Sequence, residues 1–110
     1  MDTCAYDVCS VAEMTAGGAQ LTIFSTGRGT PSGNPIAPVL KLTGNSHTAD
    51  WMADFIDFDT SASLRQEQTI EQLGEALLQM ILRVASGEFV KHEVLGVGNE
   101  IAMPRLCNYC

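Results

Sequence analysis

The sequence lacks the features that mark a membrane protein, a secreted protein or a nucleic-acid-binding protein. No uninterrupted apolar run approaches the roughly 20 residues that a membrane-spanning helix needs, so we expect no membrane partner. The N-terminal segment MDTCAYDVCS is acidic and has no basic start or apolar stretch of a signal peptide, so we expect a cytoplasmic location. The chain has 6 basic against 13 acidic residues, a formal net charge of −7. Because its Lys and Arg are scattered and phosphate contacts need them clustered, we expect no nucleic-acid partner.

The length and composition of the chain suffice for one folded domain. With 110 residues and 45% apolar content, the chain has the size and composition of a globular domain with a modest core. No internal repeat, low-complexity tract or clear linker divides it, so we expect residues 1–110 to form a single domain.

Four cysteines allow two interpretations. Cys4 and Cys9 lie near one end, and Cys107 and Cys110 form a C-x-x-C at the other. If the termini met, the four thiolates would suit a zinc ion. The alternative is a set of unliganded thiols, as is usual in a reducing compartment. The loose spacing of the first pair favours the second interpretation.

Residue patterning predicts three helices and two buried strands. The helices are expected at residues 7–16, 48–56 and 70–86, and the strands at residues 21–24 and 39–43. Thr69 and Gln72 form a capping box at the start of the last helix, and Gly87 is a candidate cap at its end. Residues 57–68 are expected to be irregular, and residues 88–110 are weakly patterned, with a possible edge strand at 100–103.

This order of elements predicts an α/β fold. A helix, a Gly-Gly stop and a buried strand are how an α/β unit enters its next parallel strand. We therefore expect a small, mainly parallel sheet flanked by helices, in a Rossmann-like layered domain.

The segment between the two strands, residues 26–38, is the candidate functional loop. Three Gly and three Pro in GRGTPSGNPIAP exclude a helix or a central strand. Gly27 and Gly29 allow positive φ and close approach of a ligand to the backbone. Arg28 can grip a carboxylate with two parallel hydrogen bonds. Neutral groups suited to the hydroxyls of a polyol also occur in the loop: Thr26, Thr30, Ser32 and Asn34.

Two nucleotide-binding motifs are excluded for this loop. A dinucleotide fingerprint would need Gly in place of Ser32, and no Gly-Lys-Ser/Thr follows for a P-loop. Chemistry alone leaves two interpretations open. The loop either binds an anion or is a rigid structural turn in which Arg28 pairs with a local carboxylate.

The loop and its surroundings resemble the altronate and galactarate dehydratase family, which includes sulfolactate sulfo-lyase large subunits. FSTGRGTPSGNPIAPVLKLTGN is similar to the family's TTGRGTPxGxPxAPVIKxxxN, and MDTCAYDVCSVAEMTAGGAQ, QTIEQLGEALLQMILRVASGEF and HEVLG also match. The resemblance implies the C-terminal domain of a lyase that removes water, or sulfite, from a hydroxylated acid. It also implies substrate contacts by this loop, at Thr26, Gly27, Arg28, Gly29, Thr30 and Asn34.

Cofactors and further domains are implied by the same resemblance. Family members use a divalent metal, iron or manganese, but we expect this segment alone to hold none. Because family enzymes are several times longer, N-terminal and central domains are expected outside these residues, and the isolated chain is expected to self-associate. The family's D-x-N-A-G-R is replaced at positions 57–62 by DFDTSA. That departure favours an alternative function, a non-catalytic acid-binding or assembly module.

The remaining candidates are weaker. Asp54, Asp57 and Asp59 could hold a hard cation, but a solvated turn is the simpler interpretation. His47 and His92 have no partner at motif spacing and are expected to be surface or capping residues rather than catalytic ones. Trp51 is expected in the core or at an interface.

Overall fold

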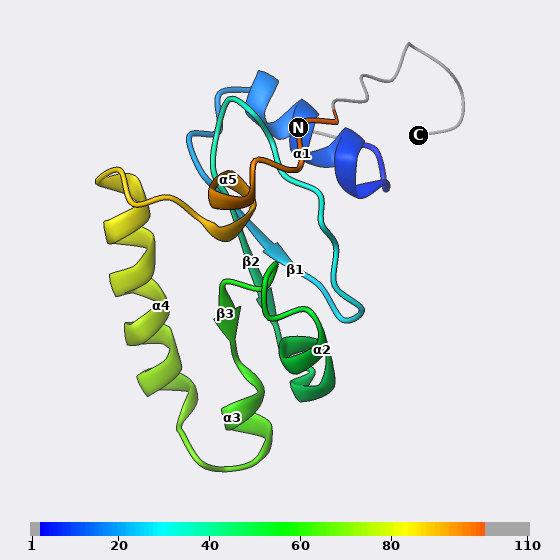
Figure 1. Ribbon diagram of the computed structural model, residues 1–110. Coiled ribbons are helices and arrows are strands. Elements are labelled where there is room, and N and C mark those ends of the chain that lie inside the picture. Colours follow the sequence, from blue (N-terminus) through cyan, green and yellow to red (C-terminus); the bar gives the residue numbers. More distant parts are fainter. Residues whose placement is uncertain (1–2, 101–110) are drawn as a thin grey trace.

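The computed structural model describes residues 3–100 and contains one parallel sheet with five helices (Figure 1). The sheet order is β1 (Thr22–Ser25), β2 (Val39–Thr43), β3 (Phe58–Asp59), and both pairings are parallel. The helices are α1 (Asp7–Ala16), α2 (Ser46–Trp51), α3 (Ser61–Leu64), α4 (Ile70–Ala85) and α5 (Lys91–Leu95). The expected small α/β domain with a parallel sheet is confirmed. Cys107, Cys110 and most of the expected strand at 100–103 lie outside the described residues.

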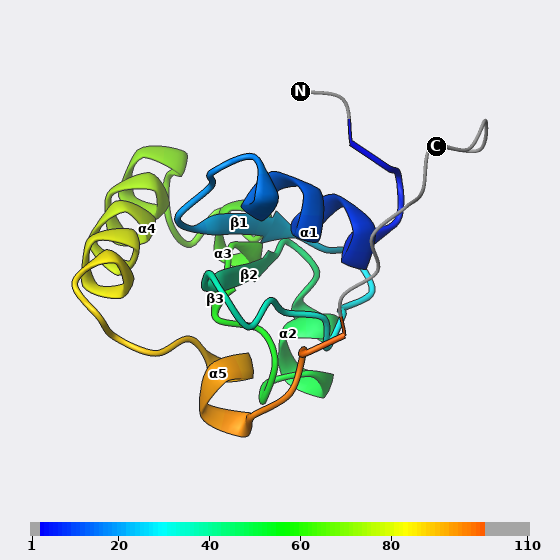
Figure 2. The ribbon, with the colours of Figure 1, turned by 90° about the horizontal axis from the view of Figure 1, so that it is seen from above.

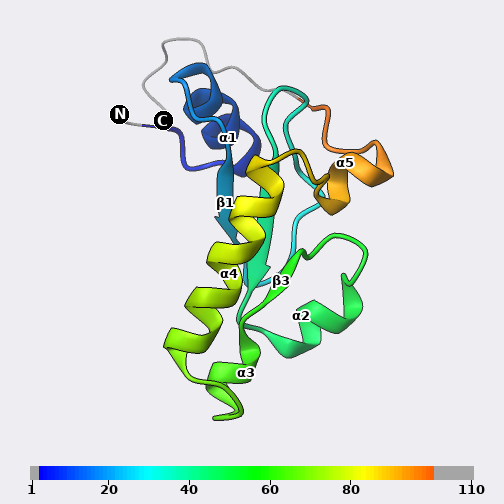
Figure 3. The same ribbon diagram turned by 90° about the vertical axis from the view of Figure 1, so that its left-hand side faces the viewer.

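The central strand β2 separates two differently covered faces. Leu40 is fully buried with Val84 and Val90, and the partly buried residues packed on this cluster are Leu21, Phe58, Leu77, Met80 and Ile81. Most of these come from α4, which lies across one face of the sheet in Figure 3. Because side chains alternate along a strand, Lys41 points to the opposite face. Seen from above, α2 lies on that side and α1 lies against β1 (Figure 2).

The predicted features of the long helix are confirmed at both ends. The side chain of Thr69 accepts a hydrogen bond from the Gln72 amide at 3.2 Å, and the Gln72 side chain accepts one from the Thr69 amide at 3.0 Å. Gly87 follows the helix with φ +106°. Ile70, the first residue of the helix, is exposed. A helix of 16 residues spans about 24 Å, and the five-residue strand β2 spans about 17 Å, so the helix overhangs the sheet.

Several boundaries differ from those expected. The first strand is shifted by one residue and lies at the sheet edge, so Ile23 is exposed rather than buried. Helix α2 begins at Ser46, capped by the Asn45 side chain, and ends at Trp51 rather than at residue 56. The segment expected to be irregular contains β3 and α3, and α5 lies in the weakly patterned tail. Within residues 3–100, every helix is too short or too polar to cross a membrane.

Asp57 connects β2 to α5 and is not part of a solvated turn as expected. One carboxylate oxygen accepts the N–H of Lys41 at 2.7 Å, and the other accepts the N–H of Lys91 at 2.9 Å. The Lys91 ammonium in turn donates to the carbonyls of Ala53 and Ile56. These contacts tie the segment before β3 to both its neighbours.

We expect Asp57→Asn to destabilise the domain by about 1.5–3 kcal/mol, because the amide nitrogen cannot accept one of the two N–H groups. Chemical unfolding followed by circular dichroism measures the change. The matched control is Asp54→Asn, three residues away and exposed, which should change stability little. Equal effects of the two substitutions would contradict the structural role given to Asp57.

Candidate functional site

The candidate loop leaves the sheet at the edge where all three parallel strands end. The amide of Thr26 donates to the carbonyl of Leu42 at 2.9 Å, and the amide of Thr60 donates to the carbonyl of Thr43 at 2.8 Å. The segments that follow β1, β2 and β3 therefore start side by side. Ligands of parallel α/β sheets bind at this carboxyl edge.

The tip of the loop is held against the start of α2. The carbonyl of Gly27 accepts hydrogen bonds from the Thr48 hydroxyl at 2.8 Å and from the Asn45 side chain at 3.2 Å. Gly29 has φ +86°, which a glycine adopts without strain because it has no Cβ. Its amide donates to the Thr26 hydroxyl at 3.0 Å. Gly27 does not use the positive-φ region. Both glycines thus serve a fixed backbone turn.

Arg28 lies at this tip and is exposed. Within residues 3–100 it makes no hydrogen bond and no ion pair, so the structural-turn interpretation, with Arg28 paired to a carboxylate, does not describe the structure. Its guanidinium is available to a ligand.

Thr30 and Asn34 are buried and bond within the loop. The Thr30 hydroxyl donates to the Ser32 hydroxyl at 3.0 Å and accepts the Ser32 amide at 3.2 Å. The Asn34 side-chain oxygen accepts the amides of Ile36 at 2.9 Å and Ala37 at 3.3 Å. Both side chains shape the loop, and their predicted contact with an acid stays a prediction.

The second half of the loop packs against His92, which is buried and not a surface residue as expected. The His92 Nε2 accepts the amide of Val39 at 3.2 Å, and Nδ1 lies 3.4 Å from the Val97 carbonyl. Gly33 lies against the ring so closely that a Cβ there would clash with Nδ1. Gly98 in turn lies against the Gly33 backbone. The absence of side chains at both glycines is what lets the ring reach β2.

Because Nε2 accepts a hydrogen bond, the buried ring is neutral, with its proton on Nδ1. Burial lowers the pKa of His92, the Val97 carbonyl raises it in part, and the nearby Lys41 charge lowers it further. A neutral, enclosed imidazole has a positioning role. The other histidine, His47, is exposed in the first turn of α2.

Gly33→Ala should destabilise the domain by about 1–3 kcal/mol, because the added methyl group meets the buried His92 ring. Thermal unfolding of the purified variant measures this. Gly27→Ala is the control, since a Cβ at Gly27 meets nothing within 4 Å. A Gly33 variant as stable as the Gly27 variant would contradict the close packing of loop and ring.

Lys41 is a candidate residue that sequence reasoning missed. Its side chain is 0% exposed, and its Nζ has no hydrogen-bond partner within the described part of the chain. Nζ lies 5.7 Å from the ring centroid of Phe55. Burial lowers the pKa of Lys41, and the charge of Asp57 partly raises it. The signal was visible in the sequence, as a lysine in the middle of a predicted buried strand.

The described residues do not fit a metal centre. In residues 3–100 no group of three His, Cys, Asp or Glu converges, and the oxygens of Asp57 are engaged by backbone amides. Cys4 and Cys9 are hydrogen-bonded to each other. Burial raises the pKa of the Cys9 thiol, and the neighbouring Cys4 raises it further. The Cys9 thiol is therefore protonated at neutral pH. No step is therefore assigned to a metal held by these residues.

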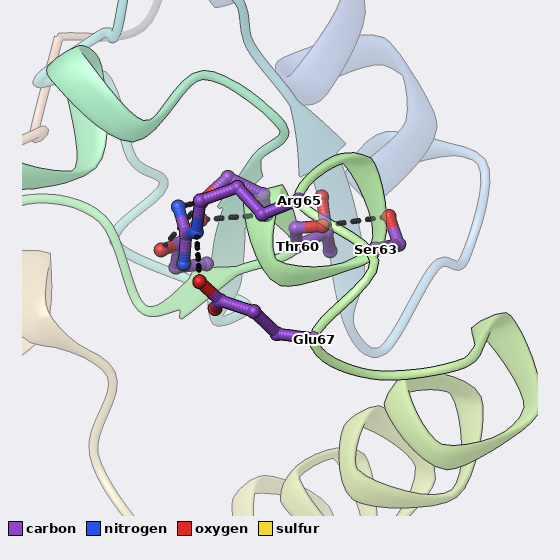
Figure 4. A network of polar contacts seen from close by, with 6 residues as sticks. Thr60, Ser63, Arg65 and Glu67 are labelled. Atoms are coloured by element: carbon purple, nitrogen blue, oxygen red, sulfur yellow. Dashed lines mark hydrogen bonds and ion pairs between the residues drawn. The ribbon is translucent and has the colours of Figure 1, made fainter.

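The turn after β3 is occupied by its own polar contacts (Figure 4). The Ser61 hydroxyl donates to Asp59 at 2.9 Å and accepts from Arg65 at 2.6 Å. The Arg65 Nε pairs with Glu67 at 2.9 Å. This is where the sequence departs from D-x-N-A-G-R, and the replacing side chains bond to one another rather than toward the loop.

Two surface hollows lie away from the loop. The larger, about 410 Å³, is lined by Ala53, Asp54, Asp57, Met80, Glu88, Phe89, Lys91, Val94 and Leu95. The second, about 210 Å³, is apolar and lies between β3 and the first half of α4. Neither includes a residue of the loop 26–38.

Comparison with known proteins identifies the family. The model of the D-galactarate/altronate dehydratase C-terminal family matches residues 1–108, and the chain belongs to that family. It is 39% identical over 106 residues to the (2R)-sulfolactate sulfo-lyase subunit beta of Chromohalobacter salexigens, covering 96% of this chain and 27% of that protein. It is 36% identical over 86 residues to the galactarate dehydratase (L-threo-forming) of Escherichia coli, covering 78% and 16% respectively. To the altronate dehydratase of Bacillus subtilis it is 30% identical over 87 residues, covering 79% and 17%. The chain thus spans about a quarter or less of these curated relatives.

Proposed function

We propose that this chain is the C-terminal domain of a hydro-lyase that dehydrates sugar acids of the altronate or galactarate type, and that its loop 26–38 binds the substrate. The observation that carries the proposal is Arg28, an exposed guanidinium without a partner in residues 3–100, at the tip of a fixed loop at the carboxyl edge of a parallel sheet. The family of the chain supports the substrate class.

The chemistry of the loop suits an acid with hydroxyl groups. A guanidinium binds a carboxylate through two parallel hydrogen bonds. The hydroxyls of Thr26 and Ser32, both half-buried, are close in sequence to Arg28 and can bond to the substrate's hydroxyls. The loop is already ordered by the contacts of Gly27 and Asn34, so binding has little ordering entropy to overcome.

On this proposal the domain contributes binding and orientation, and the rest of the enzyme contributes the proton-abstracting base and the divalent metal. The metal, iron or manganese, would stabilise the charge that develops beside the carboxylate when the proton leaves. This chain's own residues hold the carboxylate in place.

Arg28→Gln should weaken binding of galactarate or altronate by roughly tenfold or more, because a charge-assisted hydrogen-bonded pair is lost. Chemical-shift titration of the isotope-labelled chain with each acid measures the affinity and locates the contact. Arg28→Lys keeps the charge but loses the planar fork, and should fall between the wild type and Arg28→Gln.

The control for this titration is Arg83→Gln on α4, where Arg83 is exposed and pairs with Glu88 at 2.9 Å. It should leave the affinity unchanged. The proposal fails if the wild-type chain binds neither acid, or if Arg28→Gln binds as well as Arg83→Gln.

A second candidate function, an assembly module without catalysis, is favoured by the exposed apolar surface. Large apolar side chains more than two-thirds exposed are Tyr6, Ile36, Trp51, Leu64, Ile70, Phe89 and Val94. Trp51 is 74% exposed, so its expected place in the core was wrong, and a place at an interface stays a prediction. We infer from the number of these side chains that another part of the protein covers some of them.

We expect the isolated chain to self-associate reversibly through this surface, with a sedimentation coefficient that rises with concentration. Analytical ultracentrifugation measures it. Trp51→Ser should shift the equilibrium toward monomer, whereas Arg83→Gln, a polar change at an exposed position, should not. A monomer at every concentration would count against the assembly module.

A further inference from the structure

A charged side chain lies inside this small domain without the partner that burial demands. Lys41 is at the middle of β2, is 0% exposed, and its Nζ has no hydrogen-bond acceptor within residues 3–100. Burying an amine without a hydrogen bond opposes folding in either protonation state. A position of this kind in a central strand would be more stable with an apolar residue of similar size.

The carboxylate whose charge acts on Lys41, that of Asp57, is not hydrogen-bonded to Nζ. Both carboxylate oxygens of Asp57 accept backbone amides, one from Lys41 itself and one from Lys91. The Phe55 ring, 5.7 Å from Nζ, offers a cation–π contact, which only partly replaces the lost water. The Lys41 side chain therefore has a binding capacity that the described residues leave unused.

The basic residues of the described chain divide into two groups. Arg65 and Arg83 pair with carboxylates, and the Lys91 ammonium donates to two carbonyls. The side chains of Arg28 and Lys41 have no ion pair and no hydrogen bond within residues 3–100. Lys41 pairs in register with Phe24, which is four residues before Arg28.

Residues 52–55 lie next to both the loop tip and the Lys41 ammonium. Gly29 lies against the side chain of Met52, and a Cβ at Gly29 would clash with the Met52 sulfur. Met52 begins the turn that reaches Phe55, whose amide donates to the Met52 carbonyl at 2.8 Å. The turn of residues 52–55 therefore contacts the loop tip through Met52 and faces the Lys41 ammonium through the Phe55 ring. Met52 has an unbranched, flexible side chain that can give way.

We propose that Lys41 is a second anion-binding residue of the sugar-acid site, which takes the second acidic group of a diacid when the turn of residues 52–55 moves aside. Arg28 holds the first carboxylate, so this inference rests on the function proposed above and deepens it. Two cations on one site select a dianionic acid, such as an aldarate with a carboxylate at each end, over an aldonate with only one.

Lys41→Met separates binding from stability, because Met has a similar length and no charge. The variant should unfold at the same temperature as the wild type or higher, since an unsatisfied buried amine is removed. Its affinity for galactarate should fall roughly tenfold or more, and the preference of the wild type for galactarate over altronate should disappear. Arg28→Gln should weaken binding of both acids alike.

The outcomes distinguish this inference from the proposed function. If Arg28→Gln weakens binding while Lys41→Met keeps both the affinity and the preference for the diacid, only the role of Lys41 is overturned. If the wild-type chain binds neither acid, the proposed function fails and the role of Lys41 with it. A Lys41→Met variant that is less stable than the wild type identifies a structural amine and also overturns the inference.

A measurement on the wild-type chain needs no variant. Nuclear magnetic resonance of the labelled lysine side chains should show the Lys41 ammonium shifting on addition of galactarate, with its pKa rising as a carboxylate approaches. The Lys91 signal is the internal control, because its ammonium is already bonded to two carbonyls. A Lys41 signal that stays unchanged at saturating galactarate would overturn the inference.

Discussion

The structure depends on how the amides of β2 are satisfied on the side of β3. Strand β3 has two residues, so it pairs only with Leu42 and Thr43 and leaves the earlier part of β2 without a neighbouring strand. Side chains take its place: His92 accepts the Val39 amide and Asp57 accepts the Lys41 amide. Buried backbone amides need such partners, and these two bonds fix where α5 and the segment before β3 must lie.

The loop and the buried lysine follow from that constraint. Once His92 reaches β2, the loop must pass close to its ring, which explains why Gly33 has no room for a side chain. Two backbone amides hold Asp57 in a position from which it makes no hydrogen bond to the Lys41 ammonium. The Lys41 ammonium stays buried without a hydrogen-bond partner within residues 3–100. The positions of the loop and of Asp57 therefore both follow from the hydrogen bonds that satisfy β2.

Sequence reasoning found the elements whose signals are local. The bounds of β2, those of α1 and the capping box of α4 were predicted as they stand, because apolar spacing and cap residues are contained within each segment. It missed β3, α5 and the burial of His92, which depend on partners more than ten residues away. The loop's position between β1 and β2 was also predicted, since Gly and Pro form a compact pattern, and the binding role of Arg28 stays a prediction. Lys41 was missed although it lies in a predicted buried strand, because only the folded structure shows that its Nζ has no hydrogen-bond partner within residues 3–100.

The acidic surplus of the chain does not oppose an anion site at the loop. Of the carboxylates in the described residues, Glu13, Asp57, Asp59 and Glu93 accept backbone amides, and Glu67 and Glu88 pair with arginines. None of these groups is bonded to a residue of the loop 26–38. A net charge of −7 thus coexists with an exposed Arg28 guanidinium that has no ion pair within residues 3–100. Because charges in water act over about a Debye length, roughly 8 Å at physiological salt, a ligand at the loop responds to Arg28 more than to the total charge.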